Sequence, residues 1–229
     1  MLTVNNITKK YSNGRGIFDI SFEIKEPKIT AVIGPNGSGK STLFQIIAGL
    51  SRSDKGEVLF NEQEINHLDA GIISFMPESS WLIPSFTVRQ MLMYFNVMKT
   101  NKDNRDNIDR LIKLLDIEKY QHQHISSLSQ GMKQKLAAVC AFVGNPKLII
   151  FDEPLNYLDI ESVISFKKLL RYYSQRGTYI LISSHILDFL DNVAQKTIFL
   201  HNGQIEEICD NIGSQTLEEK YKSIFLGRT

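Results

Sequence analysis

A glycine-rich segment between an apolar run and a helical pattern constrains the fold of this chain more than any other feature. Residues 34–42 read GPNGSGKST, which fits the phosphate-loop pattern G-x-x-x-x-G-K-[ST], and the apolar residues 29–33 come directly before it. Glycines let successive backbone N–H groups turn toward a phosphate, and the N-terminus of the following helix carries about half a positive charge. The segment predicts a strand, a phosphate-binding loop and a helix, with a nucleoside triphosphate as ligand.

The residues of this loop have expected roles. Lys40 is predicted to reach the β- and γ-phosphates, and Ser41 to offer a hydroxyl to Mg²⁺. Thr42 continues the first helical turn, where its N–H or hydroxyl adds a phosphate contact. The rest of the nucleotide site is expected to come from the preceding positions of the loop: Gly34, Pro35, Asn36, Gly37, Ser38 and Gly39.

Length and composition exclude several classes of protein. The 229 residues, 42% of them hydrophobic, suffice for one globular domain with a sizeable core. The longest apolar run, residues 136–143, is far shorter than the roughly 20 residues of a membrane-spanning helix. The first residues lack the pattern of a signal peptide, which predicts the cytoplasm. Cys140 and Cys209 are expected to be small buried hydrophobic residues. The net charge of +1 gives no broad surface for nucleic acid, so none is expected as a partner.

The period of the apolar residues changes along the chain. The first 80 residues predict five short strands and one helix after Lys40, with the strands at 2–7, 20–24, 29–33, 56–60 and 72–75. From about residue 85 the spacing is helical, at 88–98 and 108–115, with a polar connection at 99–105. This middle part is therefore predicted to be a helical insert.

Strands and helices alternate after Pro146, as in a parallel sheet flanked by helices. The expected order is a strand, a helix, a strand and a helix, at 147–151, 160–174, 178–183 and 186–193. Asn202 and Gly203 predict a two-residue hairpin turn between strands at 196–200 and 204–209. A short helix is expected at about 216–226.

Residues 148–153 read LIIFDE and predict an apolar strand that ends in two carboxylates. Enzymes with a phosphate loop use such a strand end to hold Mg²⁺ and to prepare an attacking water. Asp152 is therefore the expected metal ligand. Glu153 is the expected general base, which must lie within hydrogen-bond reach of that water. By itself the pattern also fits a strand end with solvated acids, and the upstream loop favours the chemical roles.

The segment 127–135 reads SLSQGMKQK from Ser127 onward. Ser129 is a predicted helix N-cap with the small neighbour Gly131, so a hydroxyl and free N–H groups face outward as an anion site. Serine is a common N-cap, so the segment alone also fits an ordinary capped helix. In this segment the chain resembles the ATP-binding cassette (ABC) family, whose signature reads Leu-Ser-Gly-Gly-Gln. Gln130 stands for the first Gly of that signature and Met132 for its final Gln, while Ser129 and Gly131 keep the pattern.

The resemblance implies further roles. It implies that Ser129, Gln130 and Gly131 close on the γ-phosphate of a second subunit's ATP in a head-to-tail homodimer or heterodimer. Tyr11 stands where the family places an aromatic residue on adenine, although a half-buried tyrosine at a strand end is the alternative. His185 matches the histidine that contacts the γ-phosphate, so the resemblance implies Glu153, His185 and Lys40 as catalytic residues. Asp159 matches the loop that couples the two sites across the dimer.

One metal ligand departs from the family pattern. Glu78 stands where the family has a glutamine, so the implied Mg²⁺ ligands are Ser41, Glu78 and Asp152, and altered metal dependence is expected. Trp81 follows in a region that, by resemblance, borders the groove for a helix of a membrane subunit. Ordinary packing of this tryptophan inside its own subdomain is the alternative.

The sequence therefore predicts an α/β fold over residues 1–229. The expected domain has a P-loop NTPase core at 1–84 and 146–229, with an N-terminal antiparallel part, and a helical subdomain at 85–145. The resemblance, nearest to exporters of the ABC-2 type, implies an ATP-hydrolysing subunit on the inner face of the membrane that drives a separate permease. The alternative is an ABC ATPase that powers or regulates a non-transport envelope machine. A kinase built on the same phosphate loop is a third possibility, and the signature segment and Glu153 distinguish this chain from it.

Overall fold

The computed structural model describes residues 1–65, 71–78, 81–100, 105–114, 116–210 and 215–227. The chain forms two compact units. The terminal unit comprises residues 1–68 and 179–229, and the central unit comprises residues 69–178. Each is described by itself below.

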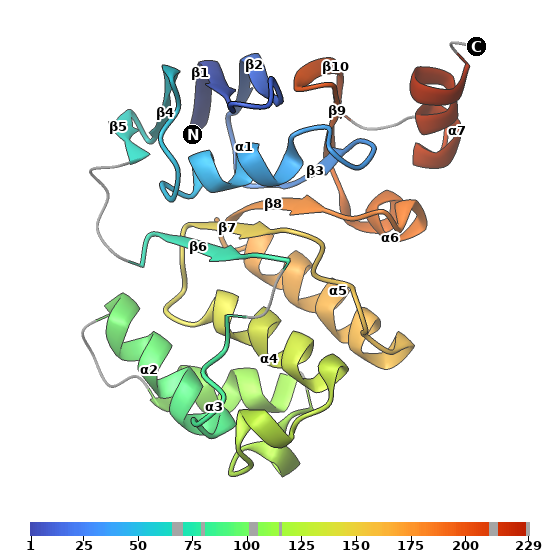
Figure 1. Cartoon of the computed structure of the whole chain (residues 1–229). Coiled ribbons are helices and arrows are strands. Elements are labelled where there is room, and N and C mark those ends of the chain that lie inside the picture. Colours follow the sequence, from blue (N-terminus) through green and yellow to red (C-terminus); the bar gives the residue numbers. More distant parts are fainter. Residues whose placement is uncertain (66–70, 79–80, 101–104, 115, 211–214, 228–229) are drawn as a thin grey trace. The chain divides into compact units, whose positions relative to one another are not determined.

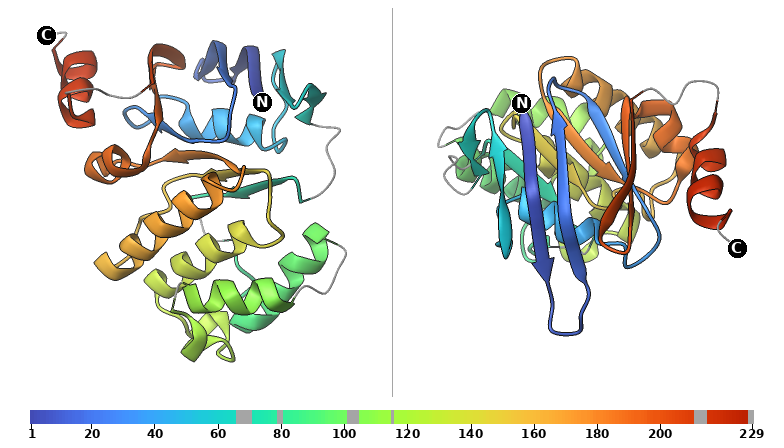
Figure 2. Two further views of the ribbon diagram at one scale, coloured as in Figure 1. Left: turned by 180° about the vertical axis from the view of Figure 1, so that it is seen from behind. Right: turned by 90° about the horizontal axis from the view of Figure 1, so that it is seen from above.

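An antiparallel sheet opens the terminal unit. Its order is β2 (Gly16–Ile24), β1 (Leu2–Lys10), β4 (Lys55–Phe60) and β5 (Gln63–Glu64). Figure 2 (right) shows β1 and β2 as a long pair of neighbouring strands. Alternate residues of β2 are buried toward its end, which is the pattern of a strand with one face on a core. The predicted N-terminal antiparallel part is confirmed.

Parallel strands form the second layer of the terminal unit. β3 (Ile29–Ile33) pairs in parallel with both β8 (Tyr179–Ser183) and β9 (Lys196–His201), and β10 (Gln204–Asp210) pairs antiparallel with β9. All five residues of β3 are buried, as expected for a strand that is covered on both faces. This strand leads into the predicted phosphate loop.

The helices of the terminal unit follow these strands. α1 (Lys40–Ile47) comes directly after the glycine-rich loop, buries its apolar face, and lies beneath the antiparallel sheet in Figure 1. α6 (Leu187–Val193) follows β8. α7 (Leu217–Tyr221) carries a complete capping box and runs on into a π-helical turn, Lys222–Leu226.

The described part of the central unit contains two parallel strands and four longer helices. β6 (Ile73–Met76) pairs with β7 (Leu148–Phe151), and the helices lie on one side of the pair in both views (Figures 1 and 2). The ring of Phe142 is fully buried and lies 5.4 Å from Phe151 and 4.6 Å from Tyr173, between ring centroids. The helices are α2 (Val88–Thr100), α3 (Arg105–Leu114), α4 (Gln130–Phe142) and α5 (Ile160–Ser174).

Most of the predicted elements are present, and the helix at 160–174 has the predicted bounds. The short strand β5 and the 3₁₀ turns Glu118–Tyr120 and Ile125–Ser127 were missed, because two or three residues give no readable period. The polar connection predicted to begin at residue 99 was wrong at its start, since α2 continues through Thr100. The predicted division into 1–84 with 146–229 and 85–145 stays a prediction.

One predicted burial was wrong. Cys140 is buried, but Cys209 is only half-buried, because β10 is an edge strand in which every residue is exposed or half-buried. Its thiol donates to a carboxylate oxygen of Glu207 at 3.1 Å. Among the described residues, no helix combines the length and the apolarity needed to cross a membrane.

Candidate functional site

The glycine-rich loop joins β3 to α1 in the terminal unit. The Lys40 ammonium folds back across the loop and donates to the carbonyl oxygens of Gly34 at 2.8 Å and Pro35 at 3.3 Å. The Ser38 N–H donates to the Pro35 oxygen at 3.1 Å. Gly39 is the N-cap of α1 with φ +105°, a conformation that L side chains rarely adopt. The loop is therefore a tight backbone turn with the lysine folded across it, and the phosphate contacts expected of Lys40 stay a prediction.

At Gly34 and Gly39 the backbone of the loop lies so close to neighbouring strands that no side chain fits. A Cβ atom at Gly34 would lie 2.0 Å from the Leu200 oxygen on β9, and one at Gly39 would lie 2.5 Å from Cγ2 of Ile17 on β2. Within the described residues, the buried Ser38 hydroxyl has no hydrogen-bond partner. A loop of packed glycines with an unused hydroxyl and an ammonium fits a polyphosphate ligand.

A second turn supports this loop from the side. The Gly203 N–H donates to the Ser38 oxygen at 3.0 Å, and the Phe18 N–H donates to the Gly203 oxygen at 2.7 Å. Gly203 has φ +78°, and a Cβ there would lie 2.3 Å from the Gly16 oxygen. The sequence predicts this hairpin turn, but its contact with a loop about 165 positions away leaves no local signal.

Tyr11 and His185 also belong to the terminal unit. Tyr11 follows β1 directly in the turn to β2, its N–H donates to the Arg15 oxygen, and its side chain is exposed. His185 lies two residues beyond the end of β8. Because β3 and β8 are parallel, with Val32 opposite Ser183, the phosphate loop and His185 leave the strands at the same edge. The exposed Tyr11 ring leaves a face open for stacking.

The two predicted carboxylates and Glu78 lie in the central unit. β6 and β7 end side by side, with Met76 opposite Phe151, and the Asp152 N–H donates to the Met76 oxygen at 2.9 Å. Asp152 is buried, whereas Glu78 is exposed two residues beyond β6. Glu153 adopts φ +50°, which is uncommon for a residue with a side chain. Carboxylates at positions 78 and 152 thus follow paired strand ends.

The signature segment begins α4 as predicted. Ser129 is the N-cap, and its hydroxyl accepts a hydrogen bond from the Met132 N–H at 3.3 Å. A Cβ at Gly131 would lie 2.6 Å from the Tyr157 oxygen, so this helix start packs on the loop that leads to α5. The Gln134 amide donates to the oxygens of Glu153 at 3.4 Å and Pro154 at 3.2 Å. Gln134 is a positioning contact that the sequence did not reveal.

Asp159 has a structural task that the sequence analysis did not assign. It is the N-cap of α5, and its Oδ1 accepts hydrogen bonds from the Ser162 N–H at 2.7 Å and the Ser162 hydroxyl at 2.5 Å. Both bonds lower the pKa of the Asp159 carboxyl, and the bond from the Ser162 hydroxyl has the larger effect. The pattern of an acidic residue at the first position of a helix was readable in advance.

Trp81 packs inside the central unit. Its ring lies 4.7 Å from that of Phe95 in an edge-to-face arrangement, and its indole N–H is buried. This contact favours ordinary packing of the tryptophan.

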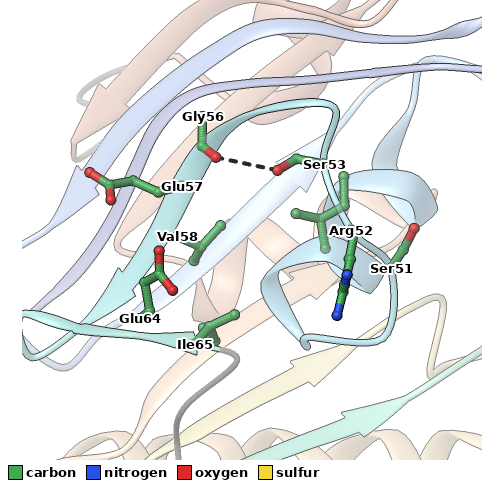
Figure 3. Close-up of a pocket in the computed structure, with 9 residues that line it drawn as sticks. Ser51, Arg52, Ser53, Gly56, Glu57, Val58, Glu64 and Ile65 are labelled. Carbon is green, nitrogen blue, oxygen red and sulfur yellow. Dashed lines mark hydrogen bonds between the residues drawn. The ribbon is translucent and has the colours of Figure 1, made fainter.

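A separate cavity of about 150 Å³ opens in the terminal unit between the end of α1 and β4 (Figure 3). Arg52, Glu57 and Glu64 line it, and the Ser53 hydroxyl donates to the Gly56 oxygen at its edge. The predicted nucleotide-site residues are not among its lining residues.

A family model described as "ABC transporter" matches residues 17–156. The chain belongs to the ABC transporter family. The match includes the phosphate loop, the signature segment and the two carboxylates, which are the segments whose geometry is described above. The chain is accordingly an ABC-type ATPase, the ATP-binding subunit of the family, with a P-loop NTPase fold.

Relatives of this ABC ATPase match over nearly its full length. The lantibiotic transport ATP-binding protein SrtF of Streptococcus pyogenes is 29% identical over 227 residues, covering 99% of this chain and 98% of SrtF. The SkfA peptide export ATP-binding protein SkfE of Bacillus subtilis is 28% identical over 208 residues, covering 90% of this chain and 87% of SkfE.

Solved structures with this fold are ABC cassettes. An ATP-binding subunit of an ABC transporter matches with a TM-score of 0.88 and 25% identity, covering 98% of this chain and 99% of that one. The ATP-binding cassette MJ0796, solved as a dimer in a post-hydrolysis state with ADP and Pi, matches with a TM-score of 0.84 and 25% identity, covering 92% of this chain and 98% of that one.

Proposed function

We propose that this ABC ATPase works as a head-to-tail dimer around two ATP·Mg²⁺ and drives a separate membrane permease. The observation that carries the proposal is that each of the two units has a helix N-terminus of the kind that binds anions. One is the phosphate loop before α1, and the other is the N-cap Ser129 of α4, which has no phosphate loop in its own unit. Two such copies, arranged head to tail, supply both features to each nucleotide.

The terminal unit is proposed to bind the nucleotide. Its loop N–H groups, from Gly34 through Thr42, surround the phosphates, and the Lys40 ammonium exchanges its two carbonyl acceptors for phosphate oxygens. Ser41 is the proposed Mg²⁺ ligand of this unit. Tyr11 stacks on the adenine, and His185 orients the attacking water.

The central unit is proposed to supply the hydrolytic carboxylates. Asp152 and Glu78 follow paired strand ends and are the proposed Mg²⁺ ligands of this unit. Glu153 accepts the proton of the attacking water, a step that contributes about 10²- to 10⁴-fold in rate. Bound Mg²⁺ would neutralise charge on the phosphate oxygens. Ser129, Gln130 and Gly131 are proposed to act on the partner copy's nucleotide, with Asp159 coupling the two sites.

The names of the relatives support a transport role. SrtF and SkfE are named as ATP-binding proteins of lantibiotic transport and of peptide export. A permease of that kind would hold this chain on the inner face of the membrane. The proposed partners are ATP, the permease and a second ATPase subunit, identical or related, and no nucleic acid.

The dimer is tested with the Glu153→Gln chain, which binds ATP but lacks the general base. Light scattering with ATP and Mg²⁺ is expected to give twice the mass of the 26.1 kDa chain. Adding Ser129→Arg to the same chain places a bulky cation at the helix start and should restore the monomer. A Glu153→Gln chain that binds ATP and stays monomeric would contradict a dimer built by this chain alone.

A further inference from the structure

Lys99 carries a buried charge that the proposed chemistry does not use. It lies at the end of α2, and its ammonium donates to the Ser74 hydroxyl at 2.8 Å and to the oxygens of Cys140 at 2.9 Å and Ala141 at 3.4 Å. The ring of Phe95 lies 5.4 Å below it. All three N–H donors of the lysine therefore have acceptors within the central unit.

These acceptors belong to two elements of this unit that adjoin proposed site residues. Ser74 is in β6, which ends two residues before Glu78. Cys140 and Ala141 are in the last turn of α4, which begins after Ser129. The Cys140 oxygen also accepts a hydrogen bond from the N–H of the C-cap residue Val143 at 3.3 Å. The Lys99 ammonium thus connects the C-terminal end of α4 to β6, the strand that precedes Glu78.

Two glycines let the backbone approach Lys99 closely on both sides of this contact. A Cβ at Gly71, just before β6, would lie 2.2 Å from the Lys99 oxygen. A Cβ at Gly144, just after α4 and with φ +86°, would lie 3.0 Å from Cβ of Lys99. The Lys147 N–H also donates to the Ile72 oxygen at 2.8 Å, so the start of β6 and the chain beyond α4 are already joined by backbone. The lysine is enclosed by segments that approach closely because both glycines lack a side chain.

The electrostatics of this contact do not favour stability. Burial lowers the pKa of the Lys99 ammonium to about 8. The titratable group facing it from α4 is the Cys140 thiol, whose pKa burial raises to about 12, so that it stays neutral. From β6 the neighbour is the uncharged Ser74, and no described carboxylate forms an ion pair with Lys99. The contact is therefore held by three hydrogen bonds from the ammonium and not by an ion pair.

We propose that Lys99 is a positioning residue that fixes the signature helix α4 against the strand leading to Glu78. The proposal rests on the proposed function, because it assigns Lys99 to the turnover of that same ATPase. Loss of the contact lets the start of α4 and Glu78 drift relative to each other. The phosphate loop lies in the terminal unit, so nucleotide binding by that loop is expected to be unaffected.

The test compares Lys99→Met and Lys99→Arg with wild type in steady-state ATP hydrolysis, from about pH 6.5 to about pH 9.5. The exposed Lys113, in the last turn of α3, supplies the control Lys113→Met. At neutral pH, Lys99→Met is expected to lower kcat about tenfold, equivalent to about 1.4 kcal/mol, with KM for ATP unchanged. Wild-type kcat should fall toward that of Lys99→Met as pH rises through about 8, whereas Lys99→Arg, charged throughout, should not show this fall.

Hydrogen exchange at pH 7 gives a second measurement that needs no activity. Lys99→Met should speed amide exchange in residues 73–76 and 139–142, and Lys113→Met should not. Unchanged kcat in Lys99→Met, or the same pH profile in all chains, would overturn the catalytic role. Unchanged exchange would overturn the contact itself. A wild-type chain that hydrolyses no ATP would refute the proposed function, and the exchange result would still decide whether Lys99 joins the two elements.

Discussion

The hairpin turn at Gly203 offers the sharpest test of how the phosphate loop is supported. Gly203→Ala forces a side chain into φ +78°, which costs about 1–2 kcal/mol for an L residue. The new Cβ would also lie 2.3 Å from the Gly16 oxygen, so the turn must shift. That shift strains two hydrogen bonds, from the Gly203 N–H to Ser38 and from the Phe18 N–H to Gly203. Each contributes about 0.5–1.5 kcal/mol, giving about 2–5 kcal/mol in all.

Gly177→Ala is the matched control. Gly177 has φ +91°, but nothing lies within 4 Å of a Cβ built there. It should therefore show only the conformational cost of about 1–2 kcal/mol. Urea unfolding followed by circular dichroism gives the free energy of unfolding of both variants, and a fluorescent ATP analogue gives the dissociation constant.

We expect Gly203→Ala to be less stable than Gly177→Ala by about 1–3 kcal/mol. It should also bind the nucleotide about tenfold more weakly, because the Ser38 carbonyl loses the donor that holds the loop. Gly177→Ala should bind like wild type. Equal stability losses in the two variants, together with unchanged nucleotide affinity in Gly203→Ala, would refute the role assigned to this turn.

Three further substitutions test other parts of the molecule. Phe142→Ala removes a fully buried ring and should lower the free energy of unfolding by about 3–5 kcal/mol, with Phe142→Leu far milder; equal losses in urea unfolding would contradict the packing. Glu78→Gln should change the Mg²⁺ concentration needed for half-maximal hydrolysis without abolishing turnover, and an unaltered titration would show that this carboxylate does not act on the metal. Asp159→Ala should cost about 0.5–2 kcal/mol of stability. Because the pKa of the Asp159 carboxyl is lowered in the fold, the stability lost in Asp159→Ala should shrink as pH falls below 3.8, the ordinary pKa of an aspartate. Asp159→Asn should retain the cap. A stability loss in Asp159→Ala that is the same at neutral and acid pH would contradict the assignment.

Local patterns were enough to predict the elements that carry the chemistry. The loop from Gly34 to Thr42 has a strand before it and a helix after it because glycine, lysine and hydroxyl residues at this spacing suit one backbone path. The N-cap at Ser129 was predicted from the same kind of local rule.

Contacts between distant segments could not be predicted in this way. Gln134, Lys99 and Gly203 hold their neighbours through bonds to residues 19 to 185 positions away. Periodicity shows which face of an element is apolar, but not which segment lies against it. Lys99 illustrates the error, since a lysine at the end of an apolar pattern predicts solvent, whereas three acceptors from β6 and α4 enclose it.

The pairing of β3 with β9 bears on how the protein is made. The residues of β9 follow their partners in β3 by 166 positions. Because ribosomes add about 5–20 residues per second, β9 is synthesised roughly 8–33 s after β3. The central unit is contiguous in the chain and is synthesised within that interval. A nascent chain stalled before residue 196 would carry the complete glycine-rich loop without β9 or Gly203 beside it. Nucleotide binding by this ATPase should therefore begin late in synthesis, only after β9 and the Gly203 turn have joined the sheet.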